Sequence, residues 1–106
     1  MELLNKKDFY NNLFDCYKEL LTEKQKEYFQ SYYFDDLSLS EIADNYNVSR
    51  SAIYDQLKKI YIILEQYEEK LGLLDKENKR NEIYEDYLDL DNHEILELIE
   101  RLRNVE

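Results

Sequence analysis

Five basic or polar side chains occur close together in the stretch SRSAIYDQLKK, where a helix would turn them to its outward side: Arg50, Ser51, Tyr54, Lys58 and Lys59. An arginine can read guanine or hold a phosphate, and the two lysines suit phosphates. Ser51 and Tyr54 suit polar or apolar contacts with bases. These residues indicate non-covalent recognition of duplex DNA, with the N-terminal residues of the helix in the major groove.

The charge of the chain opposes this interpretation overall but not locally. The 106 residues carry a formal net charge of -11, and a polyanion such as DNA repels an acidic surface. Residues 1–37 carry 8 acids and 5 bases, a net of -3, whereas residues 38–60 carry 3 of each, a net of 0. Residues 61–106 carry 14 acids and 6 bases, a net of -8. The acidity therefore lies mainly outside the candidate segment, although Asp55 falls inside it.

Residues for catalysis are scarce, so we expect no enzyme. The single histidine, His93, stands beside Glu94 and is expected at the surface or in a helix cap. The single cysteine, Cys16, excludes an internal disulfide and is expected to be a buried, reduced thiol. One glycine cannot build a phosphate-binding loop, and the acids are spread as on solvated helix faces. We expect no cofactor, and no pattern indicates a metal site.

The elements that must position these residues are predicted to be helices, so the fold class is all-α. There is no proline and only one glycine, Gly72, and hairpins and barrels need both for their corners. Capping boxes predict helix starts at Thr22 and at Ser38, with a weaker variant at Asn5 and Asp8. Apolar residues three and four apart predict the inner side of the first two helices: Phe9, Leu13, Phe14, Tyr17, Leu20, Leu21, Tyr28, Phe29, Tyr32 and Tyr33.

Residues 38–59 have the spacing of a helix–turn–helix. Ala43 is small where the two helices cross, and Asn47 tolerates the left-handed backbone that the turn demands. Val48 is expected to plug the turn into the core, and Ser49 to cap the second helix. Ile53 and Leu57 would anchor that helix from beneath. Several independent constraints agree, but the geometry alone does not establish a contact with DNA.

The second helix of the motif is predicted to continue to Gly72, which suits a C-terminal cap. Its apolar residues follow steps of 4, 3, 4, 3 and 4, which is a heptad row: Ile53, Leu57, Ile60, Leu64, Tyr67 and Leu71. The row either packs on helices of the same chain or forms part of a dimer seam. Both alternatives remain open from the sequence.

The C-terminal third is predicted to form further helices. Ile83, Tyr84, Tyr87 and Leu88 mark one amphipathic helix, and Asp91 with Glu94 is expected to cap another. The inner side of this last helix would carry Ile95, Leu98, Ile99 and Leu102. We therefore expect a helix–turn–helix domain over residues 1–74 and an acidic helical extension over residues 75–106, packed on that domain or on a dimer partner.

The chain resembles the YlxM family of small bacterial helix–turn–helix proteins, which are similar to region 4 of sigma factors. The resemblance is carried by the LTEKQ opening, the YYFDDLSLSEIA run, the VSRSAIYD segment and the EQYEEKLGL close, within residues 5–74. It implies DNA-facing roles for Arg50, Ser51, Tyr54 and Lys58. It also implies a link to the signal recognition particle, because genes of this family commonly lie beside those of the particle's GTPase and receptor.

Two classes of function therefore remain. One is a regulator that binds duplex DNA, expected as a homodimer because three basic residues are few. The other is an adaptor for protein or ribonucleoprotein components of the signal recognition particle, with the acidic helices meeting a basic surface. No segment approaches the length of a membrane span, and an acidic chain does not suit anionic lipid. We expect a cytoplasmic protein.

Overall fold

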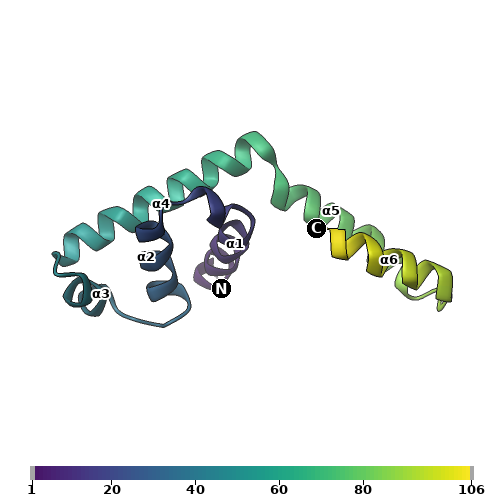
Figure 1. The fold of residues 1–106 in the computed structure, drawn as a ribbon, viewed down its shortest axis with the longest axis horizontal. Helices are drawn as coiled ribbons and strands as arrows, with labels where there is room; N and C mark the ends of the chain where they lie inside the picture. The colour runs from purple at the N-terminus through teal and green to yellow at the C-terminus, as the bar shows by residue number, and fades with distance from the viewer. Residues whose placement is uncertain (1, 106) are drawn as a thin grey trace. The chain divides into compact units, whose positions relative to one another are not determined.

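The computed structural model describes the backbone of residues 2–105 and the side chains of residues 7–105. Within that range every regular element is a helix, which confirms the predicted all-α class (Figure 1). The elements follow in the order α1 Glu2–Tyr17, a short 3₁₀ turn η1 Lys18–Leu20, α2 Glu23–Tyr33, α3 Leu39–Tyr46, α4 Arg50–Leu71, α5 Leu73–Leu88 and α6 His93–Val105.

The chain divides into two compact units, Met1–Gly72 and Leu73–Glu106. Gly72 ends α4 with φ 64 and donates its N–H to the Glu68 carbonyl at 2.8 Å. This left-handed residue is the predicted C-terminal cap, and it satisfies one of the carbonyls that a helix end leaves open.

The first unit is organised around α4, with α1, α2 and α3 along one side of it (Figure 1). Its most deeply buried side chains come from all four helices: Leu13, Tyr17, Phe29, Ile42, Ile53, Ile60 and Leu64. Phe14 and Phe29 stack at 4.3 Å between ring centroids, which joins α1 to α2. The Tyr17 hydroxyl donates to the Glu68 carboxylate at 2.6 Å, so this buried polar group has a partner.

The heptad row of α4 is therefore used largely within the chain. Ile53, Leu57, Ile60 and Leu64 are buried, whereas Leu71 at the end of the row is 46% exposed. The alternative in which the row packs on helices of the same chain accounts for its first four members.

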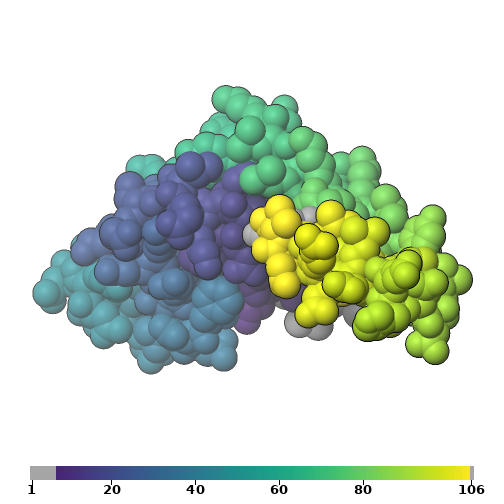
Figure 2. Space-filling view, turned by 45° about the vertical axis from the view of Figure 1, so that its right-hand side comes forward, coloured from purple at the N-terminus to yellow at the C-terminus, as the bar shows by residue number. Residues whose placement is uncertain are grey.

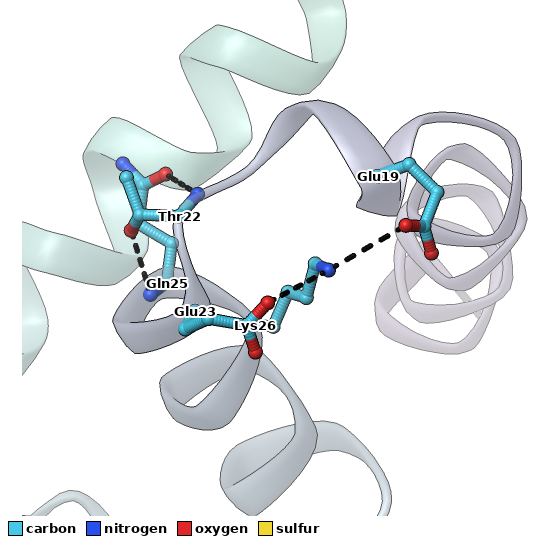
Figure 3. Close-up of polar contacts among 5 residues, drawn as sticks. All are labelled: Glu19, Thr22, Glu23, Gln25 and Lys26. Atoms are coloured by element: carbon cyan, nitrogen blue, oxygen red, sulfur yellow. Dashed lines mark hydrogen bonds and ion pairs between the residues drawn. The ribbon is translucent and has the colours of Figure 1, made fainter.

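The start of α2 shows the predicted capping box (Figure 3). Gln25 N–H donates to the Thr22 hydroxyl at 3.1 Å, and Thr22 N–H donates to the Gln25 side chain at 2.9 Å. Next to it, the Lys26 ammonium lies 3.3 Å from Glu23 and 3.8 Å from Glu19. These contacts fix the sharp change of direction from η1 into α2.

The helix–turn–helix is formed by α3 and α4. A second capping box opens α3, because Glu41 N–H donates to the Ser38 hydroxyl and Ser38 N–H to the Glu41 carboxylate, both at 3.1 Å. Asn47 takes φ 55 and ψ 44, the left-handed conformation that its spacing predicts. Ala43 is buried at the crossing of the two helices.

The prediction that Val48 plugs the turn into the core is wrong. Its side chain is 40% exposed, while its N–H donates to the Ala43 carbonyl at 3.1 Å. The backbone of Asn47 and Val48 closes the turn, so the core does not need the valine side chain there.

Replacing Asn47 with alanine is expected to lower the free energy of unfolding by about 1 kcal/mol, because a Cβ-bearing residue without a local polar group is strained at positive φ. Asn47→Gly is the matched control and should leave stability equal or slightly higher, because glycine adopts this conformation freely. Urea unfolding followed by circular dichroism measures both variants. Equal losses for the two would contradict a backbone origin.

Three further sequence predictions for the first unit need correction. Helix α1 begins at Glu2 rather than at Asn5, whose side chain lies outside the described residues. Phe9 and Leu20 are exposed at 42% and 53%, because η1 changes the register at the end of α1 and the inner side narrows to four residues: Leu13, Phe14, Tyr17 and Leu21. Cys16 is half-buried rather than buried, because it stands beside that side.

The second unit is a hairpin of α5 and α6. The N-cap of α6 is Asn92, whose side chain accepts from Ile95 N–H at 3.1 Å, so the prediction of Asp91 is wrong by one residue. Asp91 has φ 49, and a residue in the left-handed region cannot take the extended conformation of an N-cap.

Candidate nucleic-acid interface

The N-terminus of α4 is the most electropositive helix end of the motif. Ser49 caps it as predicted, with its hydroxyl accepting from Ala52 N–H at 3.0 Å. The first turns of α2 and α3 contain Glu23 and Glu41, whereas the first turn of α4 contains no acid and begins with Arg50. The helix dipole and the remaining N–H groups are therefore not neutralised, which favours an anion such as phosphate.

A row of exposed side chains continues from this end along α4. Ser51, Tyr54 and Lys58 follow steps of three and four, which brings them to one face of the helix. Tyr54 is 50% exposed, and the Lys58 ammonium lies 5.4 Å from the centre of its ring. This cation–π contact holds the lysine along the row. We call these three residues, together with Arg50 at the helix start, the exposed row of α4.

The remaining predicted site residue, Lys59, is exposed but lies on the flank of the helix rather than in the row. Asp55 is exposed beside the row, and Glu41 and Asp44 are exposed on α3. The helix–turn–helix surface therefore carries cations and carboxylates in near balance. It attracts DNA only where the cations are closer to the phosphates than the acids are.

The structure adds two residues that sequence reasoning missed. Val48 stands exposed directly before α4, where an apolar side chain can contact a thymine methyl group. Lys24 of α2 lies 4.9 Å from the ring centre of Tyr46, at the end of α3. The spacing of the sequence could not reveal this lysine, because the packing of α2 on α3 alone brings it next to the turn.

A second concave surface of the first unit is a groove lined largely by tyrosines. It has a volume of about 640 Å³ and is lined by Lys7, Tyr10, Tyr32, Tyr33, Asp36, Leu37, Ser38, Glu41 and Tyr61. Tyr10 and Tyr61 stack at 4.5 Å, and the hydroxyls of Tyr33 and Tyr61 lie 2.8 Å apart. These rings join α1 and α2 to α4. His93 is exposed at the first position of α6, far along the chain from them.

The tyrosine groove predicts a loss of stability at alkaline pH. Burial, with the hydrogen bond and charge of Glu65, raises the pKa of Tyr10 to about 12, and burial raises the pKa of Tyr61. A pKa raised in the folded state gives stability that is complete below pH 10 and is lost as pH rises towards 12. Urea unfolding at several pH values should show this fall. Tyr10→Phe should make the fall shallower, and an unchanged slope would remove Tyr10 as its cause.

Two surveys of the described residues bear on other kinds of site. Between residues 2 and 105, no group of three or more histidine, cysteine or acidic side chains is placed to hold a metal ion. None of the described helices combines the length and the apolar character needed to cross a membrane.

The capped α3–turn–α4 unit, set in a bundle of helices, defines a small all-α helix–turn–helix protein. A family model described as "Putative helix-turn-helix protein, YlxM / p13 like" matches residues 4–104. The chain belongs to this family, and the resemblance inferred from its sequence is confirmed.

The relatives support this assignment over nearly the whole chain. The UPF0122 protein YlxM of Bacillus subtilis is 48% identical over 101 residues, covering 91% of this chain and 92% of that protein. The UPF0122 protein lin1916 of Listeria innocua is 44% identical over 105 residues, with 91% and 93% covered. A UPF0122 protein of Halalkalibacterium halodurans is 58% identical over 73 residues, 69% of this chain and 67% of that protein.

Proposed function

We propose that this protein binds duplex DNA through the exposed row of α4 and acts in the cytoplasm as a regulator without catalytic activity. The observation that carries the proposal is the start of α4. There, a capped helix N-terminus without an acid in its first turn presents Arg50, followed on the outward side by Ser51, Tyr54 and Lys58. This arrangement offers phosphate contacts at the helix end and side chains for base edges beyond it.

The functional form in this proposal is a homodimer. Arg50, Lys58 and Lys59 give one chain about three phosphate contacts, which corresponds to a salt slope of roughly -2.7 at -0.9 per contact. Two copies double the slope to roughly -5.4 and offset the repulsion from a chain of formal net charge -11. A two-fold dimer also reads two half-sites about one helical turn apart.

The experiment is to measure the affinity of the full chain for duplex DNA at several salt concentrations, starting near 50 mM. The DNA should include fragments from the protein's own operon. We expect binding whose logarithm falls linearly with the logarithm of the salt concentration. Absence of binding to every duplex at low salt would reject the proposal.

A second candidate function is supported by the charge of the C-terminal unit. Residues 73–106 carry 11 acids and 5 bases, a net of -6, which suits a basic protein or ribonucleoprotein partner. The resemblance to the YlxM family places the signal recognition particle first among such partners. Capture with purified particle protein and RNA tests this candidate, and no retention of either component would count decisively against it. The two roles can coexist in one molecule.

A further inference from the structure

The C-terminal hairpin buries little of its own apolar surface. Leu74, Tyr84 and Ile99 are the buried residues of α5 and α6, and the Arg103 guanidinium covers the Tyr84 ring at 5.2 Å. Two helices of 16 and 13 residues cannot enclose a core alone, because each can turn only one side towards the other. In the space-filling view, α6 (yellow) forms an outer surface of its unit (Figure 2).

An apolar groove runs between the two helices on one face of this hairpin. Its volume is about 250 Å³, and no charged side chain lines it: Ile83, Tyr84, Tyr87, Ile95, Leu98, Ile99 and Leu102. Four of these remain widely exposed, with Ile83 at 56%, Tyr87 at 48%, Leu98 at 56% and Leu102 at 42%. A continuous apolar surface of this kind on so small a unit marks an interaction site.

We propose that the groove of the α5–α6 hairpin is covered by the same groove of a second copy of the chain, so that two hairpins form a four-helix bundle. The proposal deepens the homodimer proposed above by naming its surface. It does not use the heptad row of α4, whose first four residues are already buried in their own unit.

The charges at both edges of the groove favour a second copy as the occupant. On α6, Leu98 has Glu94 four residues before it and Arg101 three residues after it. An antiparallel α6 from the partner would bring Glu94 next to Arg101 of the partner subunit, and two-fold symmetry repeats this contact. The edge is thus complementary to itself.

The same pattern occurs on α5. The exposed Ile83 has Lys79 four residues before it and Asp86 three residues after it. Lys79 also pairs with Asp75 at 2.8 Å, so its ammonium is already held beside the groove. A partner helix with one sign of charge would meet a like charge on each edge, whereas an antiparallel copy meets opposite charges.

The size of the face indicates a modest affinity. Two helices about 10 Å wide and about 20 Å long present roughly 400 Å² in projection. The area buried by both partners would fall near the lower end for stable interfaces, which corresponds to micromolar dissociation. The oligomeric state must therefore be measured over a wide concentration range.

Sedimentation or light scattering of the full chain, without DNA, tests the proposal. We expect a concentration-dependent dimer, and we expect Leu98→Glu to raise its dissociation constant by at least about 100-fold, because the new charge would be buried without a partner. Asn104→Glu adds the same charge to α6 outside the groove and should leave the dimer unchanged. A monomer at every concentration, as when the other unit of the chain covers the groove, would overturn the proposal.

A charge exchange keeps the test valid if Leu98→Glu unfolds the hairpin. Glu94→Arg alone should weaken the dimer several-fold, and Glu94→Arg with Arg101→Glu should restore it. A double variant no better than the single one would overturn the antiparallel arrangement. Higher salt should preserve or strengthen the dimer by screening the repulsion between two acidic chains, whereas it weakens DNA binding. A wild-type dimer that binds no duplex would therefore reject the proposed function and leave this interface intact.

Discussion

Replacing Arg50 and Lys58 together with alanine is expected to lower the affinity for duplex DNA by about 100-fold or more at low salt. Each charge-assisted contact contributes roughly 1.5–3 kcal/mol, and a dimer loses two contacts per chain. The salt slope should become shallower by roughly 1.8 for each chain, since each phosphate contact contributes about 0.9. Fluorescence anisotropy with labelled duplex over a salt series measures both quantities.

Two other residues of α4 provide controls for this experiment. Lys70→Ala removes the same charge as Lys58→Ala but in the last turn, so it should change the affinity little. Asp55→Asn removes an exposed carboxylate beside the row and should strengthen binding several-fold. Equal losses for Lys58→Ala and Lys70→Ala would show that only the net charge matters, and they would remove the docking face proposed for α4.

Ile60→Ala is expected to lower the free energy of unfolding by about 2–5 kcal/mol. Ile60 is fully buried in the middle of α4, where three other helices pack, so the truncation leaves a cavity that they can fill only in part. Such a loss is a large fraction of the roughly 5–15 kcal/mol that stabilises a small domain. Urea unfolding followed by helical circular dichroism gives the value.

The matched control stands two residues further along the same helix. Ile62 is 52% exposed, and Ile62→Ala should change stability by no more than about 0.5 kcal/mol. Both variants lose the same atoms from the same residue type. Similar effects at the two positions would contradict the assignment of the inner and outer sides of α4.

Much of the helix–turn–helix could be predicted because its determinants are local. The capping boxes at Thr22 and Ser38 involve partners three residues apart, and the left-handed Asn47 depends on its own side chain and backbone. The buried row Ile53, Leu57, Ile60 and Leu64 follows from the helical period alone. The sequence spacing contains these features directly.

The errors occurred where the packing of distant segments decides. Val48 has the apolar character of a core residue, but the backbone bonds of the turn leave its side chain 40% exposed. Lys24 approaches Tyr46 only because α2 packs on α3. The cap of α6 was misplaced because Asp91 and Asn92 are both good caps, and only the left-handed backbone of Asp91 separates them.

The division of α4 into a buried row and an exposed row separates what the helix needs for folding from what it presents to a partner. Ile53 and Leu57 point inward between Ser51, Tyr54 and Lys58, so the two sets share the same three turns without sharing contacts in the core. The exposed set can be exchanged for other side chains at small cost in stability. The scaffold is therefore suited to redesign of its recognition surface, with the inward set held constant.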